Sequence, residues 1–153
     1  MPVLKRDTGH DGTVAYPKKF VTVLANGAIN AGDVVKVETD TTASPDPDTY
    51  GAAGFIVTIT TGNNSPLACG VATQTVADGE KVVVQVAGFN ANSVISAEVI
   101  AIGDTVSGSA NGDCRKCDSV GGETVWPFAV CVEAFGGTTN DGAILIMDKG
   151  WFG

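Results

Sequence analysis

Four cysteines are the residues best suited to chemistry in this chain of 153 residues. Cys114 and Cys117 form a Cys-x-x-Cys unit, the spacing of a redox pair or of half a zinc site. Cys69 and Cys131 lie singly in apolar strand patterns, where a small core residue is expected. We interpret the unit as a loop with free or locally bridged thiols, and keep a functional disulfide and a metal site as alternatives.

The other candidates for chemistry fit surface roles better. His10 is the single histidine, and it lies in an N-terminal arm where an exposed or arm-packing side chain is expected. Asp46 and Asp48 lack the spacing of a calcium loop and fit a solvated turn. The glycine-rich segment 136–142 is followed by neither a Lys-Ser/Thr pair nor a helix, which argues against a phosphate cradle. We therefore expect no enzyme activity, no cofactor and no metal.

Composition narrows the class of protein. Twenty glycines with many valines and threonines are typical of strands and turns. The net charge of −8 argues against a nucleic-acid partner, which needs clustered cations, and favours repulsion between free copies. No apolar run approaches the roughly 20 residues of a membrane helix, so no membrane partner is expected. The polar start at residues 1–7 does not resemble a signal peptide, which predicts a protein that stays where it is made.

One pattern of strands and turns occurs twice. Each copy has a Gly-Asp turn before a strand, a short second strand, and an Asp-Gly turn before a third. The copies span residues 31–37, 70–72 and 78–86, and residues 102–108, 129–134 and 141–147. The Gly-Asp turns are 71 residues apart and the Asp-Gly turns 63, so the duplication is loose. The pattern predicts an all-β fold, a compact β-barrel or β-sandwich with two structurally similar halves.

The elements divide the chain into an extended arm, residues 1–19, and a single β domain, residues 20–153. Strands are expected at 20–24, 34–38, 55–60 and 82–87. Segment 92–101 suits a short helix or a strand, and Trp126 is expected to pack in the core.

These motifs together resemble the small capsid decoration, or cement, proteins of tailed bacteriophages. The resemblance spans roughly residues 28–147 and is carried by five segments: 31–35, 70–72, 77–80, 84–88 and 102–104. It implies a β-barrel or β-sandwich, often trimeric, that sits on the finished shell at threefold or pseudo-threefold points. It implies no catalytic residues and no cofactor. Neither the Cys-x-x-Cys unit nor the aromatic C-terminus belongs to the resemblance.

The function expected on this basis is a virion structural protein that binds the outside of a phage capsid and stabilises it. The major capsid protein would be its partner, a homotrimer its assembly, and the capsid surface its location after synthesis in the host cytoplasm. One alternative is a carbohydrate- or host-binding β module, such as a head fibre base, with Trp126 or Trp151 as a stacking platform. Another is an enzyme or metal protein that uses the Cys-x-x-Cys unit.

Two sets of residues are predicted to make the contacts of such a protein. The arm has cations on a chain that is otherwise acidic, and it has apolar anchors that would be ordered only when several contacts form together. The predicted capsid-binding residues are Val3, Leu4, Lys5, Arg6, Val14, Tyr16, Lys18 and Lys19. The predicted oligomer contacts are Trp151 and Phe152, since aromatic rings gain from burial in a neighbour.

Overall fold

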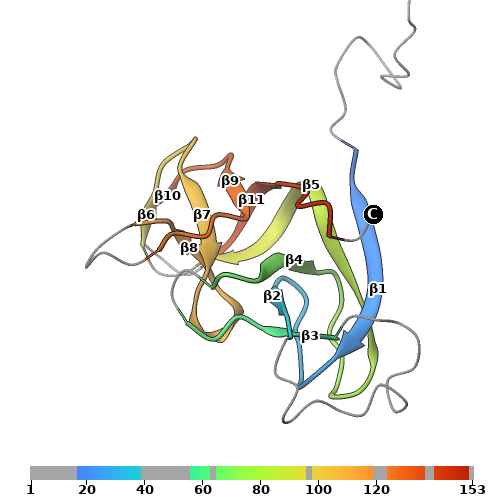
Figure 1. The fold of residues 1–153 in the computed structure, drawn as a ribbon. Helices are drawn as coiled ribbons and strands as arrows, with labels where there is room; N and C mark the ends of the chain where they lie inside the picture. The colour runs from blue at the N-terminus through green and yellow to red at the C-terminus, as the bar shows by residue number, and fades with distance from the viewer. Residues whose placement is uncertain are drawn as a thin grey trace, which may run out of the picture.

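A computed structural model describes residues 17–38, 56–62, 65–95, 98–118, 124–136 and 140–151. Within these ranges the chain is built of β-strands and one short 3-10 turn (Figure 1). The elements are β1 (Lys19–Ala25), β2 (Val34–Val37), β3 (Ile56–Ile59), β4 (Ala68–Ala72), β5 (Lys81–Ile95), β6 (Val99–Ile100), β7 (Thr105–Gly108), η2 (Ala110–Gly112), β8 (Cys114–Lys116), β9 (Ala129–Cys131), β10 (Phe135–Gly136) and β11 (Asn140–Ile146). The predicted all-β fold is confirmed. In the described residues no helix has the length and apolarity needed to cross a membrane.

The strands close two rings that share β5, a strand of 15 residues. The first barrel consists of β1, β3, β2, β4 and the N-terminal half of β5. The second barrel consists of β11, β9, β7, β8 and the C-terminal half of β5. Figure 1 shows β5 passing from the group β1–β4 to the group β6–β11. One strand can therefore hold both barrels together.

The exchange of partners along β5 occurs at Gly88. β1 pairs with β5 as far as Ala87, and β11 pairs with it from Gly88 onward. Gly88 has a φ of 90°, which a residue with a Cβ rarely adopts, and a Cβ there would lie 2.9 Å from the carbonyl oxygen of Pro17. The start of β1 can thus lie directly against β5 where the second barrel begins.

The two barrels have the same order of strand pairings. Each contains one parallel pair, β1–β3 in the first and β5–β8 in the second. The other pairs of each ring are antiparallel. The order makes β2 equivalent to β7, β3 to β8, β4 to β9, β1 to the second half of β5, and the first half of β5 to β11. The prediction of two similar halves is therefore confirmed in topology.

The Gly-Asp turns recur down to single hydrogen bonds. The Asp33 carboxylate accepts the Asn30 N–H at 2.8 Å, and the Asp104 carboxylate accepts the Ala101 N–H at 2.9 Å. Three further contacts recur at equivalent places. The Gly32 N–H donates to the Ala72 carbonyl, as the Gly103 N–H does to the Cys131 carbonyl. The Thr73 N–H donates to the Val83 carbonyl, as the Val132 N–H does to the Ala143 carbonyl. Ile29 pairs with Val76, as Ile100 pairs with Phe135.

Two sequence-based predictions are wrong in detail. The second Asp-Gly pair is not a turn, because Asp141 and Gly142 lie within β11 and pair with β5. Gly142 is needed there because a Cβ would overlap the ring of Phe135. Segment 92–101, for which a short helix and a strand were both open, is strand at 92–95 and 99–100, where β11 and β10 pair with it. Trp126 is 44% exposed and does not pack in the core.

The cores of the two barrels are continuous with each other. One buried cluster fills the first barrel. The cluster of the second barrel also takes in Val34, Ala68 and Val71, which belong to β2 and β4 of the first. Burial of apolar surface therefore joins the two barrels.

Candidate functional site

The Cys-x-x-Cys unit lies on a strand, not on a loop as predicted. Cys114 opens β8, and the Cys117 N–H donates to the Thr105 carbonyl at 2.9 Å, so the chain stays extended between them. In a strand, residues three apart point to opposite faces and lie about 10 Å apart. A disulfide needs Cα atoms within about 7 Å. The two thiols therefore cannot act together as a redox pair or as half a zinc site.

The thiols also have the wrong ionisation for a nucleophile or a metal ligand. Burial raises the pKa of Cys69 to about 12, and it raises the pKa of Cys114, Cys117 and Cys131 above the ordinary value of a thiol. The thiolate, which attacks or binds metal, is therefore scarce at neutral pH. Within the described ranges no cluster of His, Cys, Asp and Glu could hold a metal ion. His10, Asp46 and Asp48 lie outside those ranges.

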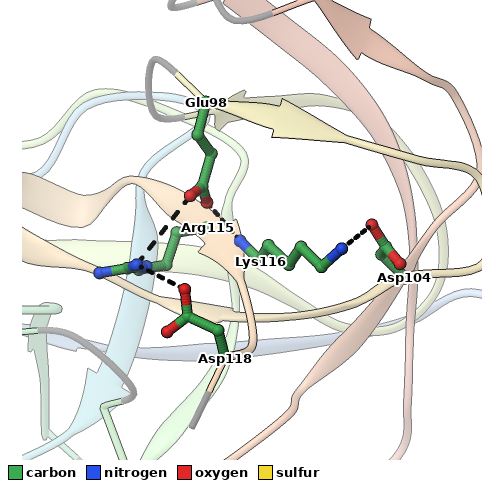
Figure 2. Close-up of polar contacts among 5 residues, drawn as sticks. All are labelled: Glu98, Asp104, Arg115, Lys116 and Asp118. Atoms are coloured by element: carbon green, nitrogen blue, oxygen red, sulfur yellow. Dashed lines mark hydrogen bonds and ion pairs between the residues drawn. The ribbon is translucent and has the colours of Figure 1, made fainter. Parts of the chain in front are cut away.

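A group of five charged residues surrounds β8 (Figure 2). Arg115 Nη2 lies 3.3 Å from Asp118 and 4.0 Å from Glu98, while Lys116 Nζ lies 2.9 Å from Asp104. The Lys116 backbone N–H also donates to the Glu98 carboxylate. Each charge has an opposite partner, and the pairs are half-buried at the surface, where an ion pair contributes about 0–1 kcal/mol. The group holds β8 in place where it closes the second barrel.

The surface best suited to binding is a groove where both ends of the described chain meet. It has a volume of about 510 Å³ and lies between the start of β1, the middle of β5 and the end of β11. Its apolar lining comes from Pro17, Ala87, Val130, Leu145, Ile146 and Met147. An ion pair between Lys19 and Asp148, 3.6 Å apart, joins the two chain ends at its rim. We call this the terminal groove.

Exposed aromatic rings and cations occur in the segments that border the terminal groove. Phe20 is 51% exposed, Phe89 43% and Trp151 38%. Lys18 Nζ lies 6.0 Å from the centre of the Phe89 ring, and Lys149 Nζ lies 4.9 Å from that of Trp151. A cation above an aromatic face is attracted to the ring. The attraction is weak when the pair is exposed and stronger when water is removed. The segments thus supply apolar area with positive charge, on a chain whose net charge is −8.

Comparison with known proteins gives a likeness in fold to solved structures. No protein-family model and no curated protein matches the chain. Among solved structures it is similar to the head fiber gp8.5 N base in bacteriophage phi29, with a TM-score of 0.55 and 13% sequence identity. The match covers 86% of this chain and 95% of that one. The two chains share a fold. At this identity the likeness concerns architecture.

The structure places three of the predicted contact residues in the segments around the terminal groove. Lys18 and Lys19 precede and open β1, and Trp151 follows β11. The other predicted residues lie outside the described ranges, namely Val3, Leu4, Lys5, Arg6, Val14, Tyr16 and Phe152.

The terminal groove was not predictable from the sequence. Val130 belongs to β9, Leu145 belongs to β11, and Met147 directly follows β11. The pairing of β9 with β11 places these residues beside each other. Phe89 gave a usable signal, because it follows Gly88 in a run of strand residues and interrupts the valine alternation. The remaining lining depends on which strands pair, which spacing along the chain does not reveal.

Proposed function

We propose that this protein is a phage virion structural protein that binds the outside of a capsid and stabilises the shell. The observation that supports the virion role most is the likeness in fold to a phage head fibre base, over 95% of that chain. The partner we propose is the major capsid protein.

The terminal groove and its neighbouring segments are the surface we assign to capsid binding. Each half-exposed aromatic ring can contribute part of the roughly 150–250 Å² that an aromatic side chain buries in full, and a specific interface needs at least about 1,000 Å² in total. Lys18 and Lys149 add positive charge that suits acidic patches on a shell. Residues 1–16 precede Pro17 at the groove, so the cations and apolar anchors predicted in the arm would extend the same contact.

Binding of purified protein to expanded, undecorated capsids of the parent phage tests this proposal. Met147 is 37% exposed and lines the groove, so Met147→Asp should lower capsid occupancy at least about tenfold. Ala77→Asp adds the same charge at an exposed turn of the first barrel and should bind as the unchanged protein does. Bound protein should raise the temperature at which the shells open. Equal occupancy for both variants would rule out the groove, and absence of binding by the unchanged protein would rule out the role.

A head fibre base is the second candidate, and the same likeness in fold supports it. A base would saturate the capsid without raising its opening temperature. A host- or glycan-binding module would use exposed Trp126 or Trp151 for stacking on sugar rings. A glycan array and a host-cell binding assay separate this function from capsid binding.

A further inference from the structure

The first barrel contacts the second through its Gly-Asp turn. The Val94 N–H of β5 donates to the Gly32 carbonyl at 3.0 Å. A Cβ on Gly32 would lie 2.6 Å from the carbonyl oxygen of Asn92, so the turn lies directly against β5. Val34 and Val71, on the adjoining strands, are fully buried in the cluster of the second barrel. This face of the first barrel is therefore an interface within one chain.

The equivalent face of the second barrel is uncovered in the described part of the chain. No described atom lies within 4 Å of a Cβ built on Gly103, the counterpart of Gly32. Ile102 and Val99, in and beside the same turn, are 69% and 71% exposed, and Val132 is 37% exposed. Thr105, the counterpart of Val34, is exposed as well.

The fold does not require large apolar residues at these places. The first barrel forms the same turn with Ala28 and Ala31 where the second has Val99 and Ile102. Water-exposed turns favour polar side chains. The β-branched side chains here are about 70% exposed, so they bury little apolar surface within the fold. Grouped exposed apolar side chains instead mark an interaction surface. We call Val99, Ile102 and Val132 the head surface.

A surface that fits the head is present at the other end of the molecule. β1 is equivalent to the second half of β5, the strand against which Gly32 packs. Among described strands, β3 pairs with β1 only at Leu24 and Ala25. Before these residues, Phe20 is 51% exposed, Val21 is half-buried and Thr22 is exposed. We call residues 20–22 the tail surface.

We infer that the head surface of one copy docks on the tail surface of a second copy, and so repeats between molecules the contact that joins the two barrels within one. This contact does not rest on the proposed capsid role. It is heterologous, because different patches meet, and it yields a closed ring only if the rotation between copies closes. The head surface adjoins the terminal groove through Val130, the counterpart of Val71. Since each copy has a net charge of −8, association should strengthen as salt screens the repulsion.

Sedimentation velocity over a range of protein concentration and salt tests the contact. The unchanged protein should sediment above the monomer mass as concentration rises. Ile102→Asp in the head and Thr22→Asp in the tail should each weaken association at least about tenfold. Ala28→Asp adds the same charge at an exposed turn position of the first barrel and should associate as the unchanged protein does. Circular dichroism checks that all variants are folded.

Mixing the two impaired variants tests the head-to-tail geometry. A Thr22→Asp copy has an intact head and an Ile102→Asp copy an intact tail, so an equimolar mixture should form a heterodimer and nothing larger. A monomeric unchanged protein at every concentration and salt would overturn the inference. So would variants that associate normally, or a mixture that stays monomeric. Capsid occupancy of Ile102→Asp, measured separately, shows whether capsid binding survives without this contact.

Discussion

At the scale of single residues, the aspartates of the two equivalent Gly-Asp turns have carboxyl pKa values that are shifted in opposite directions. Asp33 is nearly buried, and desolvation, with a smaller contribution from nearby Asp113, raises the pKa of its carboxyl. Asp104 accepts a hydrogen bond from Lys116, and this lowers the pKa of its carboxyl. The same backbone turn therefore makes the stability of the protein respond to pH in two directions.

Replacing each aspartate by asparagine should expose these directions. Because the pKa of Asp104 is lower in the folded state, its ionised form stabilises the fold above pH 3.8, and this contribution disappears as pH falls through the folded pKa. Asp104→Asn should therefore lower stability at pH 7 and have a smaller effect near pH 3. The measurement is urea unfolding at several pH values.

Asp33→Asn should show the opposite trend in the same experiment. Because the folded pKa of Asp33 is raised, the unchanged protein loses stability as pH rises from 3.8 through that pKa. The asparagine keeps an oxygen that accepts the Asn30 N–H, so the stability of the variant should rise relative to that of the unchanged protein over this pH range. Parallel pH profiles for the two variants would contradict both assignments.

Gly142 is a position where a single added Cβ atom would disturb the packing. A Cβ there would overlap the buried ring of Phe135, so Gly142→Ala should lower the free energy of unfolding by about 1–3 kcal/mol. Gly136→Ala is the matched control, because its Cβ would meet no described atom within 4 Å, and it should stay within about 0.5 kcal/mol. Equal effects in urea unfolding would show that the overlap is relieved without cost.

At the scale of elements, β8 shows what sequence can and cannot predict. The spacing of Cys114 and Cys117 is visible in the chain, but the strand that separates their side chains forms by pairing with β7 and with β5, which the spacing does not reveal. The Gly-Asp turns were predictable because their chemistry is local. The position of Asp141-Gly142 within β11 was not, because pairing with β5 overrides the local preference of Asp-Gly for a turn.

The strand geometry of β8 predicts unequal thiol reactivity. Cys117 is half-buried, whereas Cys69, Cys114 and Cys131 are buried. With a disulfide-exchange reagent at pH 8, Cys117 should react first and the other three mainly after the protein unfolds. Cys117→Ser should remove the early phase. Joint early reaction of Cys114 and Cys117 would contradict the placement of Cys114 in the core.

At the scale of the whole molecule, the shared strand makes the two barrels one structural unit. Duplication was visible in the sequence as two sets of turns and strands, but the sharing of β5 was not. Spacing alone could not show that one strand of 15 residues exchanges partners at Gly88. Nor could it show that Val71 on β4 would be buried in the cluster of the other barrel.

This sharing predicts cooperative unfolding. Calorimetry should show one transition, with equal calorimetric and van't Hoff enthalpies, since neither barrel closes without β5. Val71→Ala, at the contact between barrels, should lower the free energy of unfolding by about 2 kcal/mol and keep a single transition. Val99→Ala, on the exposed head surface, should change the free energy of unfolding by no more than about 0.5 kcal/mol. Two separate transitions would show that the barrels are independent.

We propose that this protein attaches to the outer surface of a phage capsid through the terminal groove, beside which Lys19 and Asp148 form an ion pair. Cryo-electron microscopy of capsids of the parent phage, incubated with excess purified protein, tests it most directly. Added density is expected at regular positions on the outer shell, with the terminal groove and Trp151 against the major capsid protein. Shells that stay bare at saturating protein, or density that contacts the shell only through the opposite end of the first barrel, would contradict it.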